Sequence, residues 1–314
     1  MKFFSFQSKT THNQMQIIAL EEGELRFIVC QAGQTKKIQI SAWGEVRLSG
    51  DKGLSQSLRQ SHLSRVSNGV LMLGPDDYLF ATLEAPRVPV AELGEALRWK
   101  AKDLIDYPVE EAIVESIAVP LAPDSSGMAA YAHIAVTRSS QLAEVIQQLD
   151  DSGFSASVVD VRETAQRNMA NHLLPKNRCQ AVLYVGISHC LFTVNFNGAL
   201  LFSRRIDVSA QQVQAVDHVL RHASLEALLL EVQRSLDSVT RRFSFAFVTE
   251  LQCVGVIDLS ESITFLAQHL EIPTHLLPIS QGFEFEPCPV PNLCAQGRLF
   301  HLLGAALRDV EAIR

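Results

Sequence analysis

The feature that most constrains the fold of this chain is an order of elements that occurs twice: three short apolar strands, then alternating helices and strands. The first set of strands lies within residues 15–43, broken by Glu-Gly and Ala-Gly-Gln, and the second within 180–206, broken by Gly-Ile-Ser and Asn-Gly. Such turns between short apolar runs are typical of antiparallel meanders. The halves share this order but differ in sequence, so we predict an α/β bilobal fold with a cleft between two similar lobes.

The first half carries one distinctive segment after its meander. Residues 93–104 have apolar side chains at helical spacing and end before Tyr107-Pro108, which predicts an amphipathic helix. Strands around 113–119 and 129–137 follow, joined by a polar hairpin loop at 120–128. This segment, about 85–137, predicts a small subdomain inserted in the first lobe.

The remaining elements are predicted from periodicity and turn residues. Helices are expected at 54–63, 139–151, 162–174, 224–243, 262–270 and 298–310, and further strands at 69–74, 78–85, 155–161, 251–257 and 272–278. The expected organisation is an N-terminal tail (1–14), a first lobe (15–160) and a second lobe (161–314).

Composition excludes several classes of protein. Hydrophobic residues make up 47% of the 314 and the formal net charge is −7, so a large core is available and a nucleic-acid binder is not expected. No apolar run reaches the roughly 18–20 residues that a membrane span needs. We therefore predict a cytoplasmic protein. Whether the Phe-rich start, MKFFSF, touches lipid stays open.

The sequence offers no strong metal or nucleophile motif. Six scattered cysteines are expected to be reduced and mostly buried, and Cys288 and Cys294 lack the CxxC spacing of a zinc site. His218 and His222 are an i,i+4 pair without a third ligand, which favours a solvated helix face. Ser188 and His189 are neighbours on an expected strand, so their side chains are predicted to point apart.

The order of several segments resembles one known family. ELGEALRWKAKDLIDYPVEEAIVESIAV resembles the inserted subdomain of PilM-type pilus-assembly proteins, SVVDVRETAQRNM their link into the second lobe, LLLEVQRSLDSVTRRFS their E-x-x-R-S-L-D helix, and LFHLLGAALR their terminal helix. This family belongs to the superfamily of actin, sugar kinases and Hsp70. The resemblance implies an actin-like (ribonuclease H-like, duplicated) fold. Length and the MKFFSF start resemble its branch in the mannose-sensitive haemagglutinin (MSHA) pilus system, and the cytoplasmic part of GspL is a cousin.

The resemblance also implies where a nucleotide would bind, and the residues there depart from the pattern. Ala19 stands in the place of the first loop's aspartate and Glu21 in the place of its first glycine, so Glu21 and Glu22 would face and repel a triphosphate. The second loop keeps Gly186 and Ser188 but has Tyr184 in place of the aspartate, and the adenosine-side turn keeps only Gly255. We therefore expect a degenerate site without catalytic residues, metal or cofactor. Binding or slow hydrolysis of Mg²⁺-ATP is the alternative.

A partner is implied by the same resemblance. PilM-type proteins bind the cytosolic N-terminal tail of a single-pass PilN-like protein, in MSHA terms MshJ-like, between the main body of the first lobe and its inserted subdomain. The expected anchors for that tail are Leu97, Trp99, Leu104 and Tyr107. The implied role is a scaffold at the inner face of the bacterial inner membrane, held there by partners among the pilus platform proteins.

Overall fold

The computed structural model describes residues 14–32, 37–48, 53–61, 63, 66–86, 88–120, 131–175 and 178–308. The predicted N-terminal tail and hairpin loop at 120–128 lie almost wholly outside these ranges. The chain divides into two compact units. Unit 1 takes in the described residues up to Arg162, Phe285–Cys288 and the stretch from Ala305, and unit 2 takes in Glu163–Glu284 and Pro289–Gly304.

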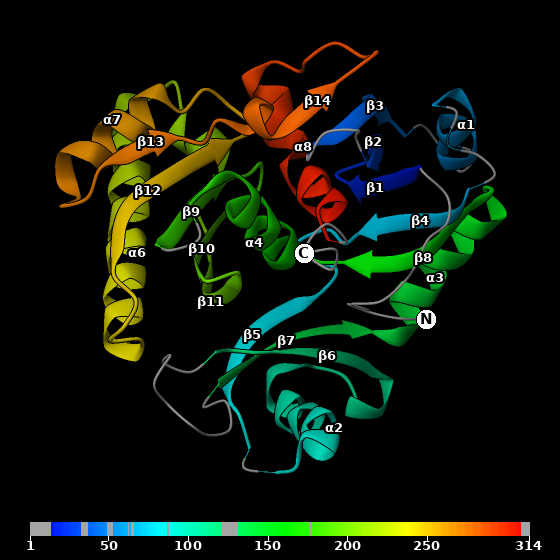
Figure 1. The fold of residues 1–314 in the computed structure, drawn as a ribbon, viewed down its shortest axis with the longest axis horizontal. Helices are drawn as coiled ribbons and strands as arrows, with labels where there is room; N and C mark the ends of the chain where they lie inside the picture. The colour runs from blue at the N-terminus through cyan, green and yellow to red at the C-terminus, as the bar shows by residue number, and fades with distance from the viewer. Residues whose placement is uncertain are drawn as a thin grey trace. The chain divides into compact units, whose positions relative to one another are not determined.

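Unit 1 is built on a mixed sheet whose described strands run in the order β14-β3-β2-β1-β4-β8 (Figure 1). The predicted meander forms its antiparallel part: β1 (Met15–Glu21), β2 (Glu24–Ala32) and β3 (Ile38–Arg47). The strands that extend the sheet in parallel beside β1 are β4 (Val66–Met72) and β8 (Phe154–Asp160). At the edge next to β3 lies β14 (Phe283–Phe285), whose last residue belongs to unit 1.

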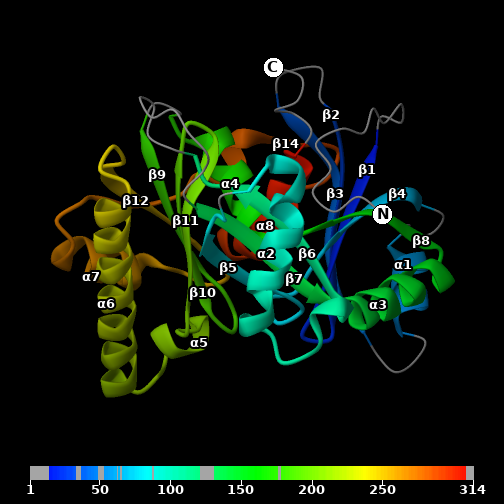
Figure 2. The same ribbon diagram turned by 90° about the horizontal axis from the view of Figure 1, so that it is seen from below.

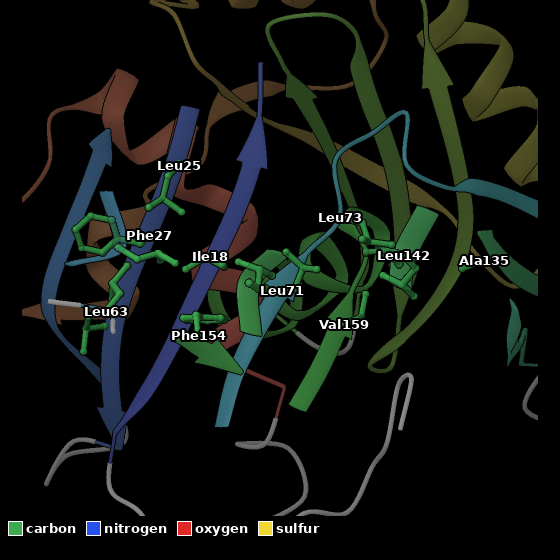
Figure 3. Packing of buried hydrophobic residues seen from close by; sticks show 14 residues of the cluster. Ile18, Leu25, Phe27, Leu63, Leu71, Leu73, Ala135, Leu142, Phe154 and Val159 are labelled. Atoms are coloured by element: carbon green, nitrogen blue, oxygen red, sulfur yellow. The ribbon is translucent and has the colours of Figure 1, made fainter. Parts of the chain in front are cut away.

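The core of unit 1 forms where this sheet meets helices α1 (Gly53–Gln60) and α3 (Ser139–Asp151). Figure 3 shows Ile18 of β1, Leu71 of β4 and Val159 of β8 directed into one cluster with Leu142 of α3 and Phe154. Ile18, Leu71, Val159 and Phe154 are at most 1% exposed. Burial of such side chains contributes roughly 1.5–3 kcal/mol each, so this cluster fixes the sheet on which the first loop stands.

The predicted inserted subdomain is a separate three-stranded sheet in unit 1. Its described strands are antiparallel in the order β5 (Leu79–Glu84), β7 (Tyr131–Arg138), β6 (Ala112–Ala118). Helix α2 (Val90–Ala101) lies against one face of this sheet (Figure 2) and continues into the short turns η1 (Lys102–Leu104) and η2 (Val109–Glu111). Helix α2 and this sheet share a cluster of buried side chains of their own, which includes Leu97, Ala101 and Ile134.

Unit 2 repeats the order of strands and helices seen in the main sheet of unit 1. Its described sheet runs β11 (Ala199–Ile206), β10 (Cys190–Phe196), β9 (Cys179–Val185), β12 (Val248–Gly255), β13 (Thr274–Leu276). Its helices are α4 (Arg162–Leu173), α5 (Ala210–Val213), α6 (His218–Arg242), α7 (Ser260–His269) and α8 (Leu293–Ala306), with a short turn η3 (Ile279–Gly282). Helices α6 and α7 lie on one side of the sheet and α4 on the other (Figure 2). From α4, the Gln166 side-chain amide donates to the carbonyls of Val182 and Leu191 and to the hydroxyl of Thr193.

Each predicted strand and helix has a counterpart in the described residues, but α1 ends at Gln60 instead of 63 and two helix starts were wrong. Helix α6 begins at His218, six residues before the predicted start, because the Asp217 carboxylate accepts from the backbone N–H groups of Val219 and Leu220. Helix α8 begins at Leu293, where Asn292 accepts from the N–H of Ala295. In both places a side-chain cap extends a helix beyond its apolar period.

Candidate functional site

The counterpart of the first nucleotide loop is the turn between β1 and β2, and it is short. Only Glu22 and Gly23 lie between the strands, both with positive φ (52° and 74°). Two such residues form the tight hairpin turn that matches the twist of its strands. The strands pair up to Glu21 and Glu24, so the turn is confined to Glu22 and Gly23.

The prediction that Glu21 faces a triphosphate is wrong. Its side chain is 8% exposed and lies between two arginines, with Oε2 2.8 Å from Arg26 and Oε1 2.6 Å from Arg162. Arg26 also contacts Glu24 at 3.3 Å. A buried carboxylate needs such compensation, so Glu21 is a structural ion-pair residue. Beside it, Ala19 is buried at 5%.

Sequence reasoning missed both arginines, although one left a signal. Arg26 stands alone among apolar residues of β2 and is 2% exposed. A lone arginine at a buried strand position implies a buried acid nearby, because unpaired charges are rarely buried. In the hairpin, Arg26 pairs in register with Ala19 and reaches along the strand to Glu21.

The counterpart of the second loop is the turn from β9 to β10. The Gly186 N–H donates to the carbonyl of His189 (3.0 Å), and the Gly186 carbonyl accepts from Ala210 (2.8 Å). A Cβ on Gly186 would lie 2.7 Å from both the His189 carbonyl oxygen and the Tyr184 ring. The glycine is therefore required by close packing, and its backbone groups are already used within the protein.

Tyr184 fills the place that an aspartate holds in the family pattern. It is 3% exposed, and its ring is stacked on Phe300 (centroids 5.8 Å apart) and in a T-shaped contact with His301 (centroids 4.4 Å apart). Both partners come from α8. An aromatic ring packed between two others belongs to the core of unit 2 and offers no carboxylate for a metal ion.

The prediction that Ser188 and His189 point apart is also wrong. They lie in the turn before β10, and the Ser188 hydroxyl is 3.0 Å from Nδ1 of His189. The alternation of side chains applies to extended strands and not to a turn. The next residue, Cys190, donates its thiol hydrogen to the carbonyl of Val208 (3.0 Å) and is buried. The hydroxyl and the imidazole are thus in contact within a structural turn.

Gly255, the counterpart on the adenosine side, ends β12. Its carbonyl lies directly against Gly297 of α8, where any Cβ would clash. Gly255 also lines a pocket of about 760 Å³ in unit 2. Most of its lining is apolar, and the polar members are Asp258, Ser260, Thr274, His275, Asn292, Gln296 and Arg298.

Three aspartates at strand ends have structural contacts. Asp160 is 2% exposed and accepts from the Val161 N–H and from Arg308 (3.3 Å). Asp258 accepts from the N–H and hydroxyl of Ser260, and these bonds hold its pKa below the usual value. Asp207 is nearly fully exposed. The first two act as turn and cap residues.

The four expected partner anchors all lie on or just after α2, but in different environments. Trp99 and Leu104 are 56% and 44% exposed, whereas Leu97 is fully buried in the α2 cluster. Tyr107 packs against the same cluster, with the Arg138 guanidinium 5.4 Å from its ring centroid. Leu97 is therefore a packing residue in this structure, Tyr107 is partly exposed, and Trp99 and Leu104 are the most exposed of the four.

A narrow slot lies on the other side of the inserted sheet, between it and the ends of β4 and β8. The slot is lined by Leu73, Tyr78, Ile113, Glu115, Ala135, Val136, Thr137, Val159 and Val161, all in unit 1. Burial raises the pKa of Glu115. The resemblance implied a groove between these elements with anchors on and after α2, but none of the four expected anchors lines this slot. Glu115 was not expected there, because periodicity alone does not distinguish it from other strand residues.

The thiols and helices of the described residues add little chemistry. Burial raises the pKa of Cys30 to about 12 and that of Cys179 to about 11, so neither is a ready nucleophile at neutral pH. Within the described ranges no cluster of three or more His, Cys, Asp or Glu could hold a metal ion. None of the described helices combines the length and apolar character that a membrane-spanning segment requires.

Comparison with known proteins gives structural matches only. No family model matches the chain, and no curated protein matches it in sequence. A chain of the PilM–PilN type IV pilus biogenesis complex matches with a TM-score of 0.74 at 18% identity, over 94% of this chain and 98% of that one. The cytoplasmic domain of EpsL, an inner-membrane component of the Vibrio cholerae type II secretion system, matches with a TM-score of 0.52 at 15% identity, over 93% and 94%.

A third match is a Bacteroides thetaiotaomicron protein of unknown function with an actin-like ATPase fold. Its TM-score is 0.51 at 14% identity, over 91% of this chain and 95% of that one. Identities this low establish the fold alone. The chain has the actin-like ATPase fold, as the order of its elements predicted.

Proposed function

We propose that this chain is a non-catalytic scaffold of type IV pilus biogenesis, PilM-like and of the MshI type in the MSHA system. The observation that carries the proposal is the match over nearly the whole length of both chains with a chain of the PilM–PilN complex. The EpsL match supports a place in the same class of envelope machine. The scaffold lies in the cytoplasm at the inner face of the inner membrane, held there by partners.

The two loop counterparts support a scaffold over an ATPase. Phosphoryl transfer needs backbone donors around the phosphates and acids that hold Mg²⁺. At the β1–β2 turn the acid Glu21 is neutralised by Arg26 and Arg162. At the β9–β10 turn the Gly186 N–H is bonded to His189 and the acid position holds Tyr184. Neither turn offers a free donor cradle with an acid beside it.

The proposed partner is the cytosolic tail of a PilN-like (MshJ-like) inner-membrane protein, and unit 1 offers it two surfaces. One is the slot lined by Ile113, Ala135 and Val161, whose carboxylate Glu115 favours a tail with a basic residue beside its apolar ones. The other is the outer face of α2 with Trp99 and Leu104. The outer face of α2 is the more accessible of the two, because the slot has a volume of about 10 Å³, room for about one water molecule.

The test is a titration of the chain with a synthetic N-terminal tail of a PilN-like protein from the same genome. Glu115→Lys should weaken binding at least tenfold if the slot is used, whereas Glu110→Lys, an exposed acid of the same subdomain, should not. A double variant, Trp99→Ala with Leu104→Ala, tests the outer face of α2, and Phe247→Ala, 67% exposed in unit 2, is its control. No binding by the parent chain, or equal binding by all variants, would contradict the proposal.

The second candidate function is ATP binding, and one observation favours it. The pocket beside Gly255 has a volume of about 760 Å³, within the size range of small-molecule sites. A nucleoside there would lack the phosphate contacts described above, so we expect weak binding without hydrolysis. A rise in melting temperature of several degrees with millimolar Mg²⁺-ATP would favour this second function.

A further inference from the structure

Helix α6 is apolar on two opposite faces, and only one of them is covered. Its buried residues are Leu225, Leu228, Val232, Ser235 and Val239. The opposite face carries Val216 just before the helix, then Leu220, Ala223, Ala227 and Leu230, which we call the α6 stripe. Val216, Leu220 and Leu230 are 99%, 62% and 47% exposed, and both alanines are exposed. A surface helix ordinarily turns charged residues to this side.

The spacing of the α6 stripe is that of a helix-pairing seam. Its members follow one another at intervals of 4, 3, 4 and 3 residues, an average of 3.5. This repeat keeps one seam facing a second helix along its length. The two central members are alanines, which allow two helix axes to approach to about 8 Å. The seam therefore fits another helix better than it fits a loose chain.

Four of the five members, from Leu220 to Leu230, read the same in either direction, whereas Val216 comes opposite Arg234. Reversal about Leu225 places Leu220 opposite Leu230 and Ala223 opposite Ala227. Two copies of the stripe packed antiparallel would thus place large residues on large ones at both ends and small on small at the centre. Symmetry of this kind is what a two-fold interface requires, because each copy offers the same patch to the other.

One pair of charges beside the stripe is complementary under the same reversal. Arg234 of one copy comes level with Val216 of the other, next to the exposed Asp217, and within its own chain Arg234 lies 2.6 Å from Glu231. His222 of one copy comes within one helical turn of Glu226 of the other. Within one chain, His222 Nε2 is already 3.4 Å from Glu226. Under this reversal the order along the pair is His222, Glu226 of the second copy, Glu226, and His222 of the second copy, so the two glutamates are neighbours and the complementary charges are those of Arg234 and Asp217.

We propose that the α6 stripe is the contact surface for a second copy of this chain, with the two α6 helices antiparallel about Leu225. A membrane surface would require basic residues along the flanks, whereas Asp217 and Glu226 are acidic. A single helix pair of about 19 residues buries no more than about 1,200 Å², the low end for specific interfaces. The dimer is accordingly weak and would form at high local concentration.

The first test is sedimentation velocity of the full chain between about 1 and 200 μM, a range that brackets a weak interface. The parent should shift from monomer to dimer across this range. Ala223→Glu places a charge in the centre of the seam and should abolish the shift. The matched control is Ala143→Glu, an exposed alanine on α3, which should leave it unchanged. Circular dichroism of each variant reports whether α6 remains folded.

The second test reads the orientation. An equimolar mixture of Ala223→Cys and Ala227→Cys chains under mild oxidation should give a cross-linked dimer faster than either variant alone, because residues 223 and 227 face each other only in the antiparallel pair. The parent chain measures the background from Cys288 and Cys294, which are partly exposed.

Three outcomes would overturn the proposal. They are a chain that stays monomeric at about 200 μM, a dimer that Ala223→Glu leaves intact, and cross-linking of each cysteine variant to itself at least as fast as in the mixture. Binding of the stripe to another protein or to vesicles without self-association counts against it equally.

Discussion

Two turns stand at equivalent points of the two units: the turn between β1 and β2 and the turn between β9 and β10. They are stabilised by different kinds of interaction. The first is held by charge, with Glu21 between Arg26 and Arg162. The second is held by shape, with Gly186 tight against His189 and Tyr184. Because the two turns share none of these contacts, each can be disturbed separately.

The largest effect is expected at the charged turn. Arg162→Met removes one partner of the buried Glu21 carboxylate and should lower the free energy of unfolding by about 3 kcal/mol, since a buried charge then loses its compensation. Arg138→Met is the control, because its pair with Glu111 is about 40% exposed and should be worth less than about 1 kcal/mol. Denaturant midpoints give both values. Equal losses would refute the contrast between buried and exposed pairs.

The packed turn should respond to added volume. Gly186→Ala places a Cβ 2.7 Å from two neighbours and should cost about 1–3 kcal/mol of stability. Gly94→Ala, in α2, meets nothing within 4 Å and should stabilise by up to about 1 kcal/mol through helix propensity. Thermal unfolding of the two variants should therefore shift in opposite directions. A neutral Gly186→Ala would mean that the turn has room to open.

A smaller effect is expected for the hydroxyl in the packed turn. Ser188→Ala removes its contact with His189 and should cost no more than about 1 kcal/mol. The matched control is Ser238→Ala on α6, whose hydroxyl only donates back to the Arg234 carbonyl, so this change should be neutral or slightly stabilising. Both are measured by denaturant midpoint. A loss of several kcal/mol at Ser188 would indicate a larger network than the turn shows.

The smallest effects differ between the units in their dependence on pH. Burial, and then the charge of Glu21, raise the pKa of Glu22. The folded state therefore binds the Glu22 proton more tightly than the unfolded state does, and stability falls as the pH rises from the unfolded-state pKa through the folded-state pKa. Glu22→Gln should remove this fall and gain stability over the parent only at the higher pH. Asp258 has a lowered pKa, so its contribution is present above the unfolded-state pKa and is lost as pH falls through the folded-state value.

The matching change is Asp258→Asn, which should lose stability at neutral pH and little at low pH. Melting temperatures of both variants and the parent, taken from about pH 3 to pH 8, give the two opposite slopes. If the melting temperatures of Glu22→Gln and the parent change in parallel with pH, the pKa of Glu22 is not raised in the folded state.

Much of the fold followed from local pattern. The double meander, the α2 segment and the alternation of later elements were predictable because strands alternate with period 2 and helices with period 3.6. The start of α6 was missed because its first turns, around Val219 and Leu220, face outward with apolar residues and show no amphipathic period. There the Asp217 cap defines the helix, and caps are weak signals unless they are sought.

The candidate site was less predictable, because its decisive contacts join residues far apart in the sequence. Glu21 could be placed at the turn, but the Arg162 that neutralises it lies 141 residues later. Leu97 and Trp99 are two residues apart on one helix, and only the packing against Ile134 decides that Leu97 is buried. Sequence thus located the elements of the site, and tertiary packing decided which side chains are free to act.

The account depends most on the claim that both turns are closed to phosphate, and one measurement tests it directly. The melting temperature of the parent chain should be recorded with Mg²⁺-ATP from micromolar to millimolar concentration. The account predicts no shift at micromolar ATP and at most a slight one at millimolar, since a ligand that does not bind the native state cannot stabilise it. A shift of several degrees at micromolar ATP, lost in Gly186→Ala, would contradict it and favour a nucleotide-binding protein.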